Sequence, residues 1–320
     1  MERNSYSWKI IAVVLIVSIL GTICKAEKTE SVKEKKKQNV IGVVMKSSSS
    51  EYWMSVRSGM EAASRKYGMK VIIMSPNSEL DNDVQTRQVE KLIDRSVDAL
   101  AISPIDSYDL PDYMNTIEEQ KIPTVTFDTG FEGDNLPYIG IDNKKTGYLL
   151  AQKMAEQMNH QGNVGIIAGD LKQSGHRNRV EGFKAYMMEN EPDITISFVE
   201  SGYSNLQMSE KKVTTLLQEY PEVTGIFATS AVTALGFADV ESASGIKIAT
   251  VDEQKDSLEA LENGKISVLA AQSGYEIGYE TIHHVYNMLY ENEEAKDYFL
   301  EAEILTKDNL EEYLNASEKK

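Results

Sequence analysis

Polar and aromatic side chains recur at the ends of short apolar runs along this chain of 320 residues. They include the stretch 47–53, Ser103, Asp128, Tyr203, Ser230, Asp252 and Gln272. Carboxylates and amides hydrogen-bond vicinal hydroxyl groups, and aromatic rings cover the C–H face of a sugar ring. The binding of a small polyol requires this combination of residue types. Serine, aspartate and asparagine also cap helices in any α/β protein, so their position alone leaves both explanations open.

The apolar runs that precede these residues are short, continuous and rich in β-branched side chains. They fall at 40–44, 71–74, 99–102, 124–127, 164–167, 194–199, 225–228, 246–249 and 266–269. Such runs predict strands that are buried on both faces. Amphipathic stretches lie between them, and in 81–97 the apolar side chains Val84, Val89 and Leu92 share one helical face. The alternation predicts parallel sheets flanked by helices, and the chain length favours two domains.

Parallel α/β sheets bind ligands at the carboxyl ends of their strands, so we expect the polar residues named above to meet at one site. The first predicted helix begins within the stretch 47–53. There Ser48 and Glu51 have the spacing of a capping box.

The N-terminus has the pattern of an export signal. Arg3 and Lys9 precede a mainly apolar run at 10–23, which is shorter than the roughly 20 residues of a bilayer span. The first 37 residues hold eight basic and four acidic residues, a net charge of +4. Since the whole chain carries −17, the remainder carries −21. Such an acidic body repels phosphate backbones, so we expect no nucleic-acid partner.

The single cysteine, Cys24, directly follows the apolar run. Its position resembles that of the lipidated cysteine of a bacterial lipoprotein. Cleavage after Ala26 and an uncleaved signal anchor are the alternatives. All three place the body of the chain outside the cytoplasmic membrane, either tethered to its outer face or, after full cleavage of the signal, in the periplasm.

No pattern of an enzyme or a metal site stands out. The sequence holds no glycine-rich phosphate loop, nucleophile elbow or CxxC motif. Four histidines are scattered along the chain, and we expect the adjacent His283 and His284 to point to different faces of a helix and His176 to lie on a solvated loop. We therefore expect no catalysis, no metal and no cofactor.

From about Asn39 to Asn309 the sequence resembles the type I periplasmic binding proteins of sugar ABC transporters, in particular the ribose- and galactose-binding group. The segments that carry this resemblance include VDALAISPID (97–106), IPTVTFDTG (122–130), YIGIDNKKTGYLLAQ (138–152), HRNRVEGF (176–183) and IATVDE (248–253). The resemblance implies two doubly wound parallel-sheet domains, joined by a hinge of three chain crossings, with a ligand cleft between them.

The resemblance also implies which residues bind the ligand. They are Tyr52 and Trp53 as stacking aromatics, Asp128, Asp252 and Gln272 as hydroxyl-binding groups, Arg177 as an arginine from the second domain, and Tyr203 as an aromatic on that side. Four further positions depart from the family pattern. Serines replace asparagines at Ser50, Ser103 and Ser230, and Thr129 replaces the arginine of ribose binders. Serine has one donor where the amide has two, so we expect a wider, differently connected pocket and a ligand other than ribose itself.

The expected organisation follows from this resemblance. Residues 1–24 are the signal and 25–38 a charged linker. The N-terminal lobe consists of 39–141 plus 273–301, and the C-terminal lobe of 142–272 plus 302–320. We expect a monomer that captures a monosaccharide or related polyol and delivers it to an ABC transporter permease. The alternative is a membrane-tethered sensor that presents a sugar or furanose-like signal to a receptor kinase. A transcription factor of the LacI type would need an N-terminal DNA-binding motif, where this chain has an export segment.

Overall fold

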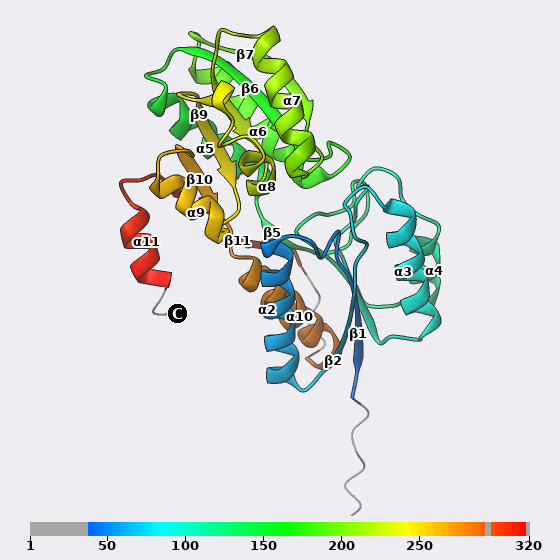
Figure 1. Ribbon diagram of the computed structural model, residues 1–320. Helices are drawn as coiled ribbons and strands as arrows, with labels where there is room; N and C mark the ends of the chain where they lie inside the picture. The colour runs from blue at the N-terminus through cyan, green and yellow to red at the C-terminus, as the bar shows by residue number, and fades with distance from the viewer. Residues whose placement is uncertain (1–37, 292–295, 318–320) are drawn as a thin grey trace, which may run out of the picture. The chain divides into compact units, whose positions relative to one another are not determined.

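The computed structural model describes residues 38–291 and 296–317. The N-terminal predictions, among them lipidation at Cys24, fall outside the described residues. The described strands form two sheets of six strands each (Figure 1). The first contains β1 (Val40–Val44), β2 (Lys70–Met74), β3 (Ala99–Ile102), β4 (Thr124–Phe127), β5 (Tyr138–Ile141) and β11 (Tyr298–Leu300). The second contains β6 (Gly162–Ala168), β7 (Ile194–Ser201), β8 (Val223–Ala228), β9 (Lys247–Val251), β10 (Val268–Ala271) and β12 (Glu303–Leu305).

Both sheets have the same strand order. It is β2-β1-β3-β4-β5 in the first sheet and β7-β6-β8-β9-β10 in the second, with β11 and β12 added at the respective edges. The chain passes between the sheets after β5, after β10 and after β11. This shared order is a structural repeat of which the sequence shows no sign.

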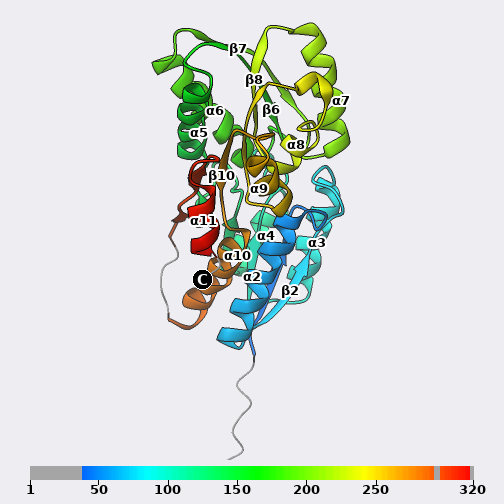
Figure 2. The same cartoon turned by 60° about the vertical axis from the view of Figure 1, so that its left-hand side comes forward.

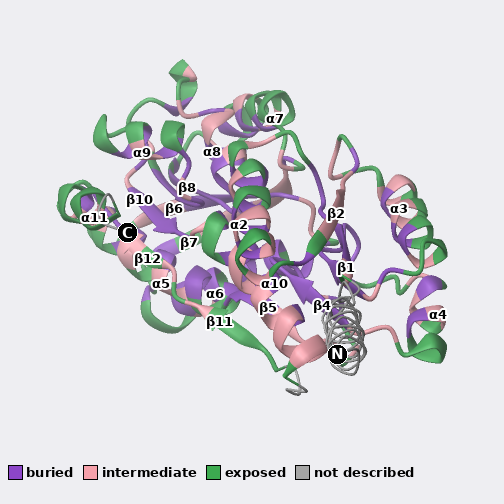
Figure 3. Cartoon of the chain, turned by 90° about the horizontal axis from the view of Figure 1, so that it is seen from below, coloured by how far each residue is buried: buried purple, intermediate pink, exposed green. Residues whose placement is uncertain are grey.

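Helices cover both faces of each sheet. Those of the first lobe are α2 (Glu51–Tyr67), α3 (Asn82–Asp94), α4 (Tyr113–Gln120) and α10 (Gly274–Tyr290). Those of the second are α5 (Asn143–Gln157), α6 (Ser174–Asn190), α7 (Leu206–Glu219), α8 (Ala231–Leu235) and α9 (Lys255–Glu262), together with the short 3₁₀ turn Glu241–Ala243; α11 (Leu310–Ser317) follows β12. Figure 3 shows buried strands between helices whose outer sides are exposed.

Neighbouring residues of β1 show how the core is divided. Val43 packs into a cluster with side chains of α2 and α10, whereas Val44 packs into another with side chains of α3 and α4. Successive strand residues point to opposite faces, so an apolar run is needed to fill both layers. This confirms the predicted fold class of two α/β domains with mostly parallel sheets.

One strand pair departs from the predicted parallel arrangement, because β12 is antiparallel to β10. Only two residues separate β11 from β12. With so short a connection the chain runs from β11 into β12 without turning back. β12 therefore enters the second sheet antiparallel to its neighbour β10. Three observed strands were not among the nine predicted: β5, β11 and β12. Two of them, β11 and β12, are only three residues long, which is too short for a recognisable apolar run.

Two helix pairs pack unusually closely, α2 with α10 and α5 with α6 (Figure 2). Each helix contributes a glycine, and a Cβ atom at any of the four would overlap a backbone carbonyl oxygen of the partner helix. The contacts are Gly59 with Tyr275, Gly278 with Val56, Gly147 with Arg179 and Gly182 with Lys144. Within the described part of the chain, no helix is both long and apolar enough to cross a bilayer.

Candidate functional site

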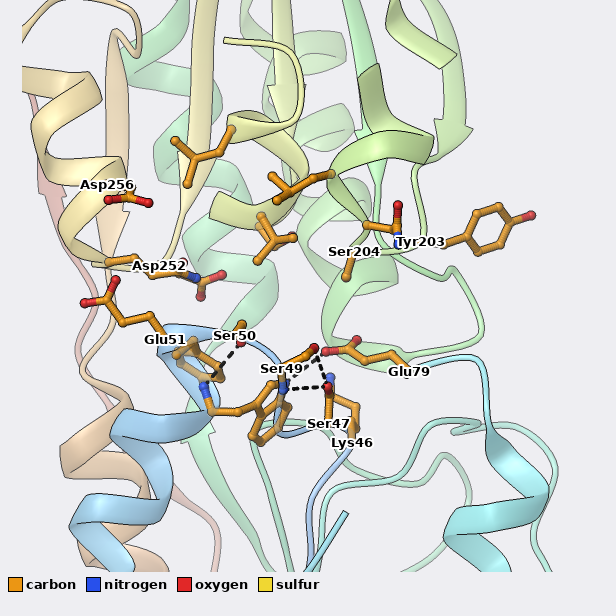
Figure 4. A pocket seen from close by; sticks show the side chains of 18 of the residues that line it. Lys46, Ser47, Ser49, Ser50, Glu51, Glu79, Tyr203, Ser204, Asp252 and Asp256 are labelled. Carbon is orange, nitrogen blue, oxygen red and sulfur yellow. Dashed lines mark hydrogen bonds between the residues drawn. The ribbon is translucent and has the colours of Figure 1, made fainter. Parts of the chain in front are cut away.

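A cavity of about 910 Å³ is lined by loops that follow strands of both sheets. Nine of the eleven predicted ligand-binding residues line it: Ser50, Tyr52, Trp53, Asp128, Thr129, Tyr203, Ser230, Asp252 and Gln272. Figure 4 shows part of this cavity, with Ser50 and Glu51 on one side and Asp252 and Asp256 on the other. Ser103 and Arg177 are not among its lining residues.

The N-terminus of α2 presents the two aromatic residues. Ser50 is its N-cap, and its hydroxyl accepts a hydrogen bond from the Trp53 backbone N–H. The predicted capping box at Ser48 is therefore wrong by two residues, because the helix begins only at Glu51. Tyr52 and Trp53 are 8% and 2% exposed, and their rings meet edge to face. The serine at position 50 thus serves the helix as well as the cavity wall.

Asp128 lies in a tight turn directly after β4. Its φ of 61° is in the left-handed region, and the Thr129 N–H donates to the Phe127 carbonyl oxygen across it. Such a backbone is costly for a residue other than glycine, and strained residues of this kind cluster at functional sites. The turn aims the carboxylate at the hydroxyl of Tyr52, which donates to Oδ1 at 2.5 Å.

Lys46 pairs with the other oxygen of this carboxylate. Its Nζ lies 2.9 Å from Asp128 Oδ2, and both side chains are buried. Burial by itself would raise the pKa of Asp128, but Lys46 and the Tyr52 hydrogen bond outweigh it and lower the pKa to about 2. Asp128 is therefore a carboxylate at neutral pH.

Asp252 occupies the equivalent place after β9 and also has a positive φ, of 88°. The side-chain amide of Gln272 donates to its Oδ1, and the Ala231 N–H donates to its Oδ2 at 3.3 Å. Burial raises the pKa of Asp252, although the nearby guanidinium of Arg179 opposes this. The two aspartates thus differ in their surroundings: Asp128 has a bonded ammonium group, and Asp252 has amide donors.

Arg179, rather than Arg177, reaches the cavity from α6. Its Nε donates to Asn143 Oδ1 and its NH1 to the Thr229 carbonyl oxygen, both at 2.7 Å, and its side chain is buried. Arg177 turns away: its guanidinium lies 4.1 Å from the ring centre of Tyr108, and its Nε donates to the Leu171 carbonyl oxygen. The arginine implied by the resemblance is therefore displaced by two residues along the helix.

The other predicted residues support this arrangement. Ser103 lies behind Asp128, and its hydroxyl is 3.4 Å from Oδ2. Ser230 is the N-cap of α8, so its hydroxyl accepts from the Thr233 N–H. Tyr203 lines the cavity with a third of its surface exposed, and its backbone is in the left-handed region.

His176 is buried in α6, in contrast to the solvated position expected from the sequence. Its Nδ1 lies 2.8 Å from Thr229 Oγ1 and its Nε2 3.3 Å from Ser204 Oγ. Burial and the charges of Lys46 and Arg179 lower its pKa well below the usual value. A neutral imidazole therefore connects Ser204, which lines the cavity, to the end of β8.

One group of described residues has the composition of a metal site. Glu280, His283 and His284 bring their ligand atoms within 4.8 Å of one another on α10, so the two histidines do not point apart as expected. However, Nδ1 of His284 is hydrogen-bonded to the Glu280 carbonyl oxygen, and the His283 ring stacks on Tyr67. These contacts engage the rings in the packing of the helix.

The lining also includes residues that were not predicted to bind the ligand, among them Lys46, Glu79, Arg179 and Gln254. Glu79 accepts from Trp53 Nε1 at 3.0 Å and from Gln173 Nε2 at 3.1 Å. Nothing in the local sequence marks Glu79. Lys46 lies two residues after the first apolar run, and Gln254 lies two residues after Asp252, so their places in the pattern were the available signals.

Comparison with known proteins places this site in context. The family model described as "Periplasmic binding protein domain" matches residues 41–293. The ribose import binding protein RbsB of Bacillus subtilis is 29% identical over 280 residues, which cover 84% of this chain and 90% of that protein. A periplasmic solute binding protein from Actinobacillus succinogenes, solved with bound D-allose, superposes with a TM-score of 0.79 at 24% identity and covers 86% of this chain and all of its own. The solved XylFII-LytSN complex contains a chain with a TM-score of 0.75 at 23% identity, covering 85% of this chain and 97% of that one.

Proposed function

Because this chain belongs to the periplasmic binding protein domain family, we propose that it is an extracytoplasmic solute-binding protein for a monosaccharide or small polyol. It delivers this ligand to an ABC transporter. The observation that carries the proposal is that Asp128 and Asp252, which follow strands of different sheets, line one cavity together with Tyr52 and Trp53. A carboxylate can accept charge-assisted hydrogen bonds from ligand hydroxyls, and aromatic rings can cover the C–H face of a sugar, so a cavity with this lining suits a small polyol. The proposed activity is binding, not catalysis.

Two lobes, 39–141 plus 273–301 and 142–272 plus 302–320, form the walls of the site in this proposal. The three passages of the chain between the sheets act as its hinge. A ligand that contacts both lobes shifts the population toward the closed conformation, because it binds that conformation better. Relatives support the ligand class, since one is named for ribose import and a solved structure of the same fold contains D-allose.

The test is a calorimetric titration of residues 38–320 with a panel of pentoses, hexoses and sugar alcohols. Binding of at least one compound near micromolar affinity, about 8 kcal/mol, is expected. The Asp252→Asn variant should abolish it and remain folded. If no member of the panel binds or raises the melting temperature, the proposal fails.

A sensor is the second candidate, and one observation favours it: XylFII, which shares this fold, is solved in complex with LytSN. In that case the ligand-bound chain contacts a membrane receptor rather than a permease. Deletion of the gene separates the two functions. Loss of sugar uptake supports delivery to a transporter, whereas loss of the sugar-dependent transcriptional response with unchanged uptake supports sensing.

Membrane tethering through Cys24 is part of the proposal and has its own test. Cells are grown with a labelled lipid precursor, and the wild-type protein is compared with Cys24→Ser. Label on the wild type alone supports lipidation. An unlabelled wild type leaves cleavage after Ala26 or an uncleaved signal anchor, and N-terminal sequencing distinguishes these two.

A further inference from the structure

The carboxylate of Asp128 is surrounded by donors from the protein itself. Its Oδ1 accepts from the Tyr52 hydroxyl at 2.5 Å. Its Oδ2 accepts from Lys46 Nζ at 2.9 Å, from Thr129 Oγ1 at 3.1 Å and from Ser103 Oγ at 3.4 Å. An ionised carboxylate has about four lone-pair positions. Three of the four donors contact Oδ2 and take both of its lone-pair positions, and Tyr52 takes one of the two positions on Oδ1, so at most one acceptor position of Asp128 stays open to a ligand.

The N–H donors of the Lys46 ammonium group are also occupied by protein acceptors. An ammonium group has three N–H donors, and Nζ is within hydrogen-bonding distance of Asp128, of Thr129 Oγ1 at 2.8 Å and of Gln173 Oε1 at 2.6 Å. Gln173 is buried and donates in turn to Glu79. These contacts hold the ammonium group at the carboxylate and leave it no proton for a ligand.

On the opposite wall of the cavity, around Asp252, fewer polar groups are hydrogen-bonded within the protein. Among the described residues, two donors bond to the Asp252 carboxylate, the Gln272 side-chain amide and the Ala231 N–H. The side-chain nitrogen of Gln254 is buried and has no hydrogen-bond partner among the residues that the structure describes. A buried donor without an acceptor is costly. This wall therefore has both an acceptor and a donor available for a ligand.

We propose that Lys46 is a specificity-determining residue, which takes the place at Asp128 that a ligand hydroxyl would otherwise take. Recognition of hydroxyl groups then falls to Asp252 and Gln254. The ligand class that fits is a polyol that presents a C–H group instead of a hydroxyl to Asp128, as a deoxy sugar does. This inference rests on the proposed function and concerns the same cavity.

Matched sugars test the proposal by calorimetry: D-ribose against 2-deoxy-D-ribose, and D-galactose against its 6-deoxy form, D-fucose. We expect the wild type to bind the deoxy member of one pair at least about tenfold more tightly. Lys46→Met, which removes the ammonium group and keeps a stem of similar length, should reverse or abolish that preference. Lys172→Met is the matched control, because the Lys172 side chain is 69% exposed. An unchanged preference in Lys46→Met overturns the proposal.

A second measurement uses the wild-type lysine and so does not depend on the folding of Lys46→Met. Asp128→Asn should weaken binding of the preferred sugar at least about tenfold less than Asp252→Asn does. Equal losses would show that Asp128 binds the ligand directly and would overturn the proposal. If the wild type binds none of the four sugars, the proposed function fails for these four sugars. In that case, binding of one of them by Lys46→Met would still support the role of Lys46, whereas absence of binding by the variant would overturn that role.

Discussion

The ammonium nitrogen of Lys46 lies 2.9 Å from Oδ2 of Asp128, with only 5% and 6% of the two side chains exposed. Both charges have left water, so each depends on the other for its compensation. Removing one partner of a buried pair leaves an uncompensated charge, which costs more than the pair itself contributes.

The first prediction concerns the stability of Lys46→Met. We expect a loss of about 3 kcal/mol in the free energy of unfolding at pH 7, measured by urea denaturation. The folded-state pKa of Asp128 is depressed to about 2, so its contribution in the wild type is present above the unfolded value of roughly 3.9 and is lost below it. Without Lys46, burial raises this pKa, and the deficit of the variant should shrink between pH 7 and pH 4. A deficit that is equal at both pH values, or shared by Lys172→Met, would contradict this.

The second prediction separates the two arginines of α6. Arg179→Ala removes the donors to Asn143 and Thr229, and it leaves Asp252 without its neighbouring guanidinium. We expect binding of the best ligand from the sugar panel to weaken at least about tenfold, since a hydrogen bond to a charged group contributes about 1.5–3 kcal/mol. Arg177→Ala should change affinity less than about threefold, because its side chain contacts Tyr108 outside the cavity. Equal effects of the two variants would show that the arginine was assigned wrongly.

The third prediction concerns the close helix pairs. A methyl group at Gly147 or Gly278 meets a backbone carbonyl of the partner helix, which cannot rotate away. Gly147→Ala and Gly278→Ala should each lower the free energy of unfolding by about 2 kcal/mol or more. Gly130→Ala is the control, because its nearest neighbours lie at 3.5 and 3.6 Å, an ordinary contact distance. Thermal or urea unfolding that ranks all three alike would refute the packing argument.

The fourth prediction follows from the buried neutral His176. Burial, Lys46 and Arg179 lower its pKa in the folded state, whereas Asp128 opposes them. The unfolded chain binds a proton below about pH 6.5 that the folded chain does not bind. The folded state therefore loses stability as the pH falls below about 6.5, by at most about 1.4 kcal/mol per pH unit for this group. Urea denaturation of His176→Gln should give a shallower decline between pH 7 and pH 5 and a profile parallel to the wild type above pH 7. If stability declines with falling pH equally in the wild type and His176→Gln, His176 does not cause the pH dependence.

Much of the fold could be predicted from the sequence because the sheets are buried on both faces. A run such as Ala99 to Ile102 has to be apolar at every position, since alternate residues face different helix layers. The two aspartates could be predicted for the same reason, because Asp128 directly follows such a run and Asp252 lies three residues after another. β12 could not be predicted, because three residues are too few to show a strand pattern and the direction of the strand depends on where the chain crosses between the sheets.

The choice between Arg177 and Arg179 shows the limit of the residue pattern. Two residues on a helix point about 200° apart, so one of them faces the cavity and the other solvent. Which one does so depends on how α6 packs on α5, where Gly147 contacts the backbone of Arg179. Lys46 is similar: its burial depends on Asp128, Thr129 and Gln173, all far away along the chain.

The reciprocal glycines have a practical consequence for anyone who wishes to turn this protein into a biosensor. They hold backbone against backbone in both lobes, so the spacing of the helices does not depend on which side chains line the cavity. A mutagenesis library can therefore vary Lys46, Thr129 and Gln254 at once in search of new ligands. The same library should keep all four glycines unchanged, because a variant at any of them would alter the scaffold on which every ligand contact is built.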